Sequence, residues 1–360
     1  MKYEVEVISP LHVGSGEEIS PLEYTVDEKF YRIDSDSLFK DEKFDIDGFV
    51  DDIKLGLIDI EKYKDLAKKH IKYAIEISNS ARKNIKRKDV LEFIKTGGRI
   101  YVPGSSIKGA IRTAFLWYIL KKKKELYEKM KEDLEKILTR ERKPDKKYVD
   151  DEIEKKVFGK EPQYDIFKAI QISDGNILPT DRLKIEMVKV LSTTSYGYTW
   201  KNFLLFLETL KVGTKFEIDI KIDEYLTEEN IARKLEFNDK IECLKNIEEI
   251  CKKYSMQLID YEIDFFEKYK RNDELNEIIN FYKNLKKKDD LLLRLSWGAG
   301  WHSMTIGRML QEDRDIDFLG LRKLYNLGKF SVQEFPKTRR IVFDDKPKYP
   351  LGWIKLKVKK

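Results

Sequence analysis

The stretch Arg99–Leu116, RIYVPGSSIKGAIRTAFL, decides the fold of this chain because it joins a strand to a helix through one short turn. A β-prone run over Arg99–Val102 meets a Pro-Gly turn and two serines, and an apolar stripe with helical spacing follows. Ser105 is predicted to cap the helix, since its hydroxyl can accept a backbone N–H of the first turn. The segment therefore predicts a strand, a tight turn and a helix.

Two features of the predicted helix start point to a bound anion. Lys108 lies in the first turn and Arg112 one turn later, although cations there oppose the helix dipole and cost up to about 1 kcal/mol. Gly109 costs roughly 1 kcal/mol relative to alanine inside a helix. A phosphate held close to the backbone would explain both costs. The alternative is an ordinary turn whose cations face water. We predict a phosphate clamp formed by Gly104, Ser105, Ser106, Lys108 and Arg112.

The clamp is not a nucleotide-binding P-loop. Gly104 and Gly109 have the P-loop spacing, but Ala110 and Ile111 stand where that motif needs lysine and then serine or threonine. The lysine would contact the terminal phosphates and the hydroxyl would bind magnesium. An NTPase is therefore excluded on this motif.

Composition predicts a soluble cytoplasmic protein without a cofactor or metal. The 360 residues suffice for two domains, 38% are charged, and the mean hydropathy is −0.56. No apolar run approaches the roughly 18 residues of a membrane span, and the N-terminus lacks a signal peptide's apolar core. Cys243 and Cys251 fit neither a zinc site nor a disulfide framework.

Positive charge is concentrated in two segments. Residues 82–112 hold nine basic residues against two acidic ones, and so do residues 337–360, giving +7 each in a chain of net charge +6. Such basic segments on an otherwise acidic chain indicate a surface for a polyanion.

The pattern of elements predicts an α+β fold of two ferredoxin-like (RRM-like) halves with helical insertions. We place the N-terminal half at residues 1–165 and the C-terminal half at 166–360, with a helical insertion at about 227–293 and a Gly-rich loop at 297–307. Strands are expected at 1–9, 22–26, 30–33, 166–173, 182–191, 202–210, 215–222, 341–343 and 353–358. Helix is expected over most of 45–95, with the clearest period running from Tyr63 to Ile75.

Three further segments are candidates for binding the polyanion. The loop after the first strand offers His12, Gly14, Ser15 and Gly16, although a tight surface loop would look the same. The segment WGAGWH offers Gly298, Gly300, Trp301 and His302, with indoles as stacking platforms for bases; Trp297 could equally be core. A compact basic run suits phosphate contacts and offers Lys337, Arg339 and Arg340.

Catalysis has one candidate arrangement. His12 and His302 both lie in glycine loops, and two imidazoles that converged could cleave RNA by general acid–base chemistry. No metal-ligand or hydrolase motif occurs in the sequence. We therefore predict a binding protein, with a metal-independent endoribonuclease as the alternative.

A series of motifs, taken in order, resembles the RAMP proteins of CRISPR systems. The motifs are PLHVGSG, YVPGSSIKGAIRTA, SWGAGWHSMTIG, FPKTRR and PLGWIKL. The second is shared by many RAMP proteins, whereas its combination with the third and fifth is similar to the subunit that caps the crRNA 3′ end in type III-A (Csm) effector complexes. About 80 residues carry the resemblance.

The resemblance implies an RNA-binding structural subunit of an antiviral ribonucleoprotein. Its expected partners are crRNA, target RNA, the backbone RAMP subunit of the Csm complex and recruited trimming nucleases, with no membrane. In that family target cutting is attributed to an aspartate loop on the neighbouring backbone subunit, and we find no clear equivalent here. Asp174, in ISDG, follows a strand and is expected in a turn.

Overall fold

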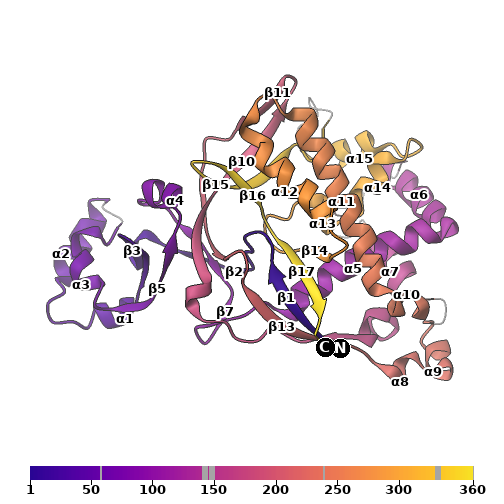
Figure 1. The fold of residues 1–360 in the computed structure, drawn as a ribbon, viewed down its shortest axis with the longest axis horizontal. Coiled ribbons are helices and arrows are strands. Elements are labelled where there is room, and N and C mark those ends of the chain that lie inside the picture. Colours follow the sequence, from indigo (N-terminus) through magenta and orange to yellow (C-terminus); the bar gives the residue numbers. More distant parts are fainter. Residues whose placement is uncertain (57–58, 140–144, 146–150, 238–239, 329–333, 360) are drawn as a thin grey trace.

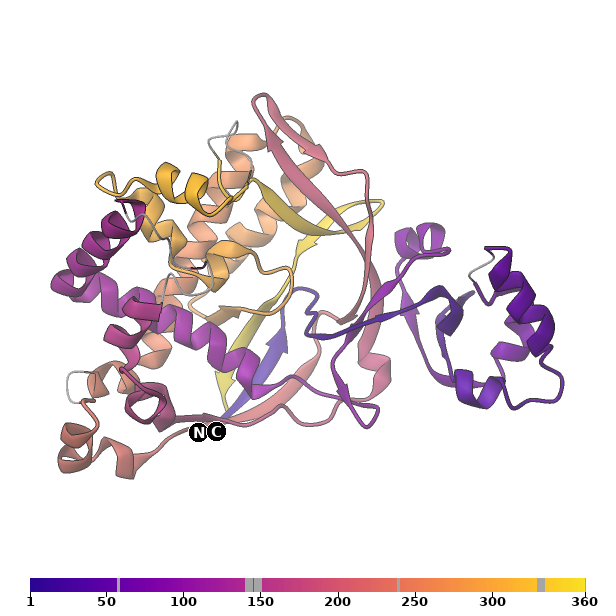
Figure 2. The ribbon, with the colours of Figure 1, turned by 180° about the vertical axis from the view of Figure 1, so that it is seen from behind.

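Two β-sheets and a layer of helices make up the fold in the computed structural model, which describes residues 1–56, 59–139, 145, 151–237, 240–328 and 334–359. The architecture is α+β, with two ferredoxin-like halves and helical insertions, as predicted. The two ends of the chain lie side by side in both views (Figures 1 and 2), where the amide of Lys359 donates to the carbonyl of Lys2.

The first sheet is antiparallel and brings both ends of the sequence together. Its strands, in spatial order, are β14 (Leu291–Arg294), β17 (Trp353–Val358), β1 (Lys2–Val7), β13 (Lys215–Ile222) and β9 (Ile170–Ile172). Alternation along β1 turns Tyr3, Val5 and Val7 into the core. The opposite face carries paired charges, among them Glu6 with Lys355 at 3.0 Å. That face is therefore balanced in charge and is not a basic platform.

The second sheet is mixed and is organised around the long strand β10 (Leu183–Thr194). The first part of β10 pairs with β12 (Leu205–Leu210) and β5 (Ile71–Ile77), and the second part pairs with β11 (Gly197–Trp200) and β15 (Thr338–Asp344). The remaining strands of this sheet are β2 (Gly14–Ile19), β6 (Val90–Phe93), β3 (Tyr24–Val26), β4 (Phe30–Ile33) and β16 (Lys346–Pro350). A separate two-stranded hairpin joins β7 (Lys95–Thr96) to β8 (Arg99–Ile100).

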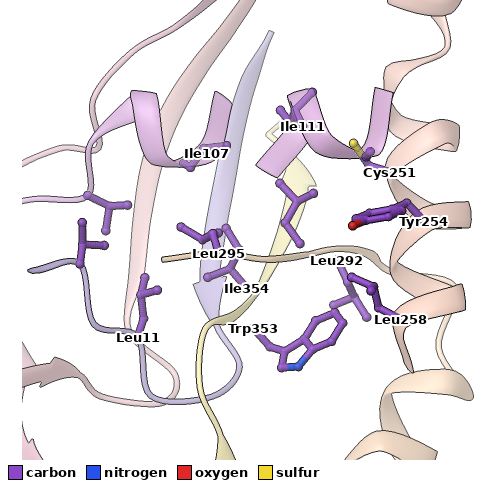
Figure 3. Close-up of a cluster of buried hydrophobic side chains, with 14 of the residues drawn as sticks. Leu11, Ile107, Ile111, Cys251, Tyr254, Leu258, Leu292, Leu295, Trp353 and Ile354 are labelled. Atoms are coloured by element: carbon purple, nitrogen blue, oxygen red, sulfur yellow. The ribbon is translucent and has the colours of Figure 1, made fainter. Parts of the chain in front are cut away.

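Two long helices cover the first sheet. Helix α5 (Gly104–Lys122) and helix α11 (Ile247–Tyr269) pack on each other and on β14. Figure 3 shows the resulting core, in which Ile107 and Ile111 from α5 and Tyr254 from α11 surround Leu292, while Trp353 lies fully buried beneath them. The other described helices outside the projecting lobe are α6 (Lys124–Thr139), α7 (Asp151–Phe158), α8 (Glu224–Thr227), α9 (Glu229–Lys234), α10 (Ile241–Lys245), α12 (Asn276–Lys286), α13 (Trp301–Met304), α14 (Gly307–Glu312) and α15 (Phe318–Leu324).

A small lobe projects at one end of the molecule (Figure 1). It contains α1 (Ser35–Leu38), α2 (Ile46–Lys54) and α3 (Lys64–Ala67), next to β3, β4 and β5; helix α4 (Asn79–Asn84) follows β5. Six buried residues give the lobe a core of its own, namely Ile33, Leu38, Phe44, Phe49, Ile60 and Ala67.

The predicted strands and helices are partly confirmed and partly wrong. The strands at 30–33, 215–222 and 353–358 have the predicted bounds. The prediction of a helix from Tyr63 to Ile75 is wrong, because Ile71–Ile77 forms strand β5. In this segment Lys72 and Glu76 alternate with apolar residues, and the same residues also fit a helical period. The segment 166–173 is a strand only at Ile170–Ile172, and β12 begins at Leu205 rather than residue 202.

The boundary at residue 165 stays a prediction. Both sheets take strands from either side of it, since β1 pairs with β13 and β17, and β5 pairs with β10. Part of the charged stretch following α6 (140–144 and 146–150) lies outside the described residues.

Candidate nucleic-acid interface

Helix α5 begins two residues earlier than predicted, and its first amide is bound by a side chain from a distant part of the sequence. Pro103, not Ser105, occupies the N-cap position, and the amide of Gly104 donates to Asp174 Oδ1 at 2.8 Å. A Cβ on Gly104 would lie 2.5 Å from the carbonyl oxygen of Ile172. This glycine is therefore required for the helix start to pack against the end of β9, and Asp174 serves the helix instead of a simple turn.

The two cations of the predicted clamp are bound to the protein. Lys108 Nζ donates to the carbonyl of Ile170 at 2.7 Å, and burial lowers the pKa of Lys108. Arg112 pairs with Asp165 at 2.8 Å and Glu154 at 3.1 Å, and its guanidinium lies over the ring of Phe158. Both side chains hold the helix to its neighbours, so a phosphate would have to compete with these contacts.

The backbone of the first turn is nevertheless accessible. Ser105 is exposed, and Ser106 is half-buried. Gly109 is exposed as well, and a Cβ built on it would meet nothing within 4 Å. No protein atom would clash with a side chain at this position, so packing within the protein does not require a glycine here. The glycine leaves the helix backbone open to a ligand that approaches from solvent.

The loop after β1 and the segment before α13 meet at one place although they lie almost 300 residues apart in the sequence, and residues 350–352 lie between them. The amide of Trp297 donates to the carbonyl of His12 at 3.2 Å, and the amide of Gly352 donates to that of Pro10 at 3.1 Å. The amide of Leu295 donates in turn to the carbonyl of Gly352. We call this meeting point of residues 10–16, 295–298 and 350–352 the loop junction.

Glycines allow these loops to approach so closely. A Cβ on Gly352, whose φ is +89°, would lie 2.3 Å from the carbonyl oxygen of Leu295. A Cβ on Gly298 would lie 2.5 Å from the side chain of Leu351. In contrast, Gly14, Ser15 and Gly16 are exposed at the start of β2, and nothing lies within 4 Å of a Cβ at Gly16 or Gly300. The interior of the loop junction is therefore tightly packed, whereas its rim is accessible to a ligand.

His12 is a buried part of this junction. Its Nδ1 lies 2.7 Å from the carbonyl oxygen of Glu208, so the neutral ring donates from Nδ1. Burial lowers the pKa of His12 to about 4 despite this bond. The ring packs edge-on against Trp297, with centroids 5.7 Å apart. His12 therefore supports the position of Trp297 and is not itself a surface contact.

The exposed Arg340 lies over the ring of the half-buried Trp297, which belongs to the junction. The guanidinium of Arg340 lies 4.5 Å from the ring centroid of Trp297. Arg340 is exposed on β15, and it has no ion pair with a described residue. Trp297 is half-buried against a small apolar cluster with Val188, Leu207, Val342 and Leu351. A flat cation stacked on an indole can contact phosphate through its edge and a base through its face.

Arg339, one residue earlier, points to the opposite side of the sheet. Only 5% of it is exposed, and its Nε lies 2.8 Å from Glu262 Oε2. Although burial alone would lower the pKa of Arg339, the nearby Glu262 carboxylate raises it. Arg294 also reaches Glu262, at 3.6 Å, from inside the core. Arg339 and Arg294 are therefore internal ion-pair partners, and we do not count them as RNA contacts.

His302 and Trp301 are also packing residues. His302 is 3% exposed, and its ring packs against Tyr261 with centroids 4.3 Å apart. Burial, aided by Arg339, Arg308 and Arg294, lowers the pKa of His302 to about 2. Trp301 lies on Gly307, where a Cβ would come within 1.8 Å of the indole, and packs against Phe335 and Phe318. The indole that remains as a platform is Trp297, which the sequence did not distinguish from core.

The two basic segments adjoin in space. The amide of Ser80, in α4, donates to Asp344 Oδ1 at 2.9 Å, and Lys83 lies 3.5 Å from Asp345. Lys86 and Lys88, which follow α4, are exposed and have no ion pair with a described residue. Much of the C-terminal charge is compensated, however, because lysines in β16, in β17 and just after β17 pair with acidic residues, among them Lys346 with Glu277, Lys348 with Asp344, Lys355 with Glu6 and Lys359 with Glu217.

Within the part of the chain that the structure describes, no three His, Cys, Asp or Glu side chains are grouped to hold a metal ion. None of the described helices is long and apolar enough to span a membrane. The carbonyl of Lys337, a half-buried residue before β15, accepts a hydrogen bond from the amide of Thr193, and the residue has a further interaction.

Comparisons with known proteins agree with the geometry. A protein named Csm5 of a CRISPR system, from Methanocaldococcus jannaschii, is 28% identical over 99% of this chain and 88% of its own length. A chain in a cryo-EM structure of a type III-A Csm–crRNA–target RNA ternary complex has a TM-score of 0.78 and 25% identity, covering 99% of this chain and all of that one. The crystal structure of Csm5 from T. onnurineus shares the fold, with a TM-score of 0.69, 24% identity and 98% and 99% coverage.

The family assignment rests on a match over most of the chain. Residues 4–301 match the RAMP superfamily, a range that includes the start of α5 and the glycine loop before α13. The chain belongs to the RAMP superfamily.

Proposed function

We propose that the chain is an RNA-binding structural subunit of a type III-A CRISPR ribonucleoprotein. It caps the filament at the crRNA 3′ end and supports crRNA maturation and antiviral defence. The names of its relatives support the type of complex, since one is a Csm5 protein and another lies in an assembly with crRNA and target RNA. Its partners are crRNA, target RNA, the backbone RAMP subunit and trimming nucleases.

The observation that carries RNA binding is the stacked pair of Arg340 and Trp297 on the loop junction. The pair offers an uncompensated cation and an aromatic face on one surface, which are the two elements that single-stranded RNA binds. The exposed Gly14 and Gly16 and the half-buried Gly300 line the rim, where a sugar–phosphate backbone can approach closely. The start of α5, with Ser105, Ser106 and Gly109, provides a second contact on the same strand of RNA.

The endoribonuclease alternative is not favoured. A general acid–base pair needs one imidazolium near neutral pH, whereas the pKa values of His12 and His302 are lowered to about 4 and about 2. Both rings are buried and face different neighbours, His12 against Phe93 and His302 against Tyr261. A labelled repeat RNA incubated with the chain in EDTA should stay intact; a single cut that disappears in His302→Ala would reverse this conclusion.

The clamp is tested by the double substitution Lys108→Ala/Arg112→Ala. If both cations contact phosphate in the complex, the double variant binds unrelated RNA sequences more weakly, and by a similar factor for each sequence. The slope of log Kd against log salt concentration should then decrease by the amount expected for the loss of one to two phosphate contacts. Since Arg112 also holds Asp165 and Glu154, circular dichroism must first show a folded variant. Unchanged affinity and salt slope would remove the clamp from the proposal.

The proposed position at the crRNA 3′ end is tested in the assembled ribonucleoprotein complex. The chain is mixed with the backbone subunit and a guide RNA labelled at its 3′ end, and nuclease protection is compared with and without it. We expect protection of the 3′ part to depend on the chain, and the substitution Arg340→Ala to shorten the protected region. Protection confined to the 5′ part would contradict the capping role without affecting RNA binding itself.

A further inference from the structure

The projecting lobe has an apolar surface that nothing in the described chain covers. Phe39, Ile46 and Val50 are 40%, 49% and 42% exposed, whereas the neighbouring Phe49 is 6% exposed. Ile46 and Val50 are four residues apart on α2 and thus share one face of the helix. Phe39, which follows α1, contacts Phe49 with ring centroids 5.7 Å apart. The three exposed side chains therefore extend the core of the lobe out to its surface.

The surroundings of this apolar face are strongly acidic. From Asp34 to Lys54 the sequence holds eight acidic and three basic residues, a net charge of −5, although the whole chain carries +6. Asp36, Glu42 and Asp47 are exposed and have no ion pair with a described residue; the same holds for Lys40 and Lys43, so acidic side chains outnumber basic ones among the unpaired charges as well. Asp51, one turn after Asp47, is paired only with Lys54 on the helix surface. The lobe thus combines an apolar centre with an acidic rim.

An apolar surface with an acidic rim indicates which class of molecule can bind to the lobe. RNA is disfavoured, because its phosphates would meet the net charge of −5 on the segment from Asp34 to Lys54. A second copy of the same face is disfavoured as well, since two rims of like charge would be brought together. A protein surface with basic residues around apolar anchors satisfies both the centre and the rim.

We propose that the face formed by Phe39, Ile46 and Val50 docks a basic protein partner that inserts apolar side chains between its own lysines and arginines. The proposal does not depend on the RNA contacts at the loop junction, which lie on another part of the molecule. The interface positions the partner at the end of the long axis of the subunit (Figure 1).

The test is site-directed crosslinking of the full chain. The only cysteines, Cys243 and Cys251, are 3% and 2% exposed, and burial raises the pKa of Cys251 to about 12. A benzophenone maleimide therefore labels an introduced cysteine selectively. Val50→Cys is labelled, irradiated in a lysate of the source cells, and the crosslinked peptide is sequenced. Phe203→Cys, 54% exposed on another surface, is the matched control.

We expect a crosslink from position 50 to a protein segment with an excess of Lys and Arg next to apolar residues, and no such crosslink from position 203. Asp47→Lys combined with Asp51→Lys should reduce the yield at least tenfold, while Asp45, which caps α2, is left unchanged. Thermal unfolding of each variant shows that the lobe is folded. A crosslink to RNA, to a second copy of this chain or to an acidic segment would overturn the proposal, and so would the absence of any crosslink.

Discussion

The two faces of strand β15 hold adjacent arginines in opposite surroundings. Arg339 is buried and bound to Glu262 at 2.8 Å, whereas Arg340 is exposed and stacked on Trp297. In the sequence the two are indistinguishable members of one basic run. Alternation along the strand separates them, because neighbouring side chains point to opposite faces.

The difference shows that an arginine is available to bind a ligand only if no carboxylate of the protein already pairs with it. Inside the sheet, Arg339 and Arg294 neutralise one buried carboxylate, and the imidazole of His302 stays neutral beside them. On the outer face of the sheet, Arg340 forms no ion pair with a carboxylate of the described residues, so its guanidinium is available to an anionic ligand. The same distinction applies to Arg112, which faces Asp165 and Glu154.

The largest effect is expected from Arg339→Ala. It leaves Glu262 buried without its nearest partner, and breaking such a buried pair costs about 3–5 kcal/mol of folding free energy. Chemical denaturation of the purified chain would measure the loss. Arg340→Ala is the matched control, since removing an exposed side chain should change stability by about 0.5 kcal/mol or less. Equal losses for the two variants would contradict the assignment of the two faces.

The fold could be predicted where local pattern and tertiary pairing agree. Strand β13 and strand β17 alternate clearly, and their predicted bounds are correct. The helix start at Gly104 was misplaced because its cap, Asp174, lies 70 residues away and cannot be recognised locally. The strand at Ile71–Ile77 was missed because a short apolar run fits both helical and strand periods.

The buried imidazoles predict a loss of stability in mild acid. The pKa values of His302 and His12 are lowered to about 2 and about 4, so the unfolded chain binds more protons than the folded one below about pH 6.5. Stability is therefore full above pH 6.5 and falls as the pH drops, by up to about 1.4 kcal/mol per histidine per pH unit.

Denaturant midpoints at pH 7, 6 and 5 would measure this slope. His302→Gln, which removes one titrating group next to Arg339, should give a shallower slope than the unchanged chain. A slope that is unaffected by the substitution would show that other groups cause the acid sensitivity.

On the exposed face, Arg340→Ala should weaken RNA binding about tenfold, which is about 1.4 kcal/mol. Arg340→Lys keeps the charge but loses the flat stacked group, so an intermediate affinity is expected. Fluorescence anisotropy with a short unstructured RNA measures both variants. Affinity equal to the unchanged chain for Arg340→Ala would remove the stacked pair from the RNA surface.

The candidate site was only partly predictable. Glycine loops and aromatic residues singled out segments that meet at the loop junction, but the sequence showed neither that they meet nor which side chains face outward. His12, His302 and Arg339 were chosen for their chemistry and are buried. Trp297 and Arg340 are distinguished from Trp301 and Arg339 only by strand register and by contacts with residues far away in the sequence.

The smallest and most discriminating effect is expected from Gly109→Ala. A Cβ at this position meets no protein atom within 4 Å, so the substitution should stabilise α5 by up to about 1 kcal/mol through helix propensity alone. If RNA approaches the helix here, the same methyl group should weaken RNA binding. Stability and affinity would then change in opposite directions, which neither of the arginines of β15 can produce. A more stable variant with unchanged affinity would leave the loop junction as the RNA surface and remove the start of α5 from it.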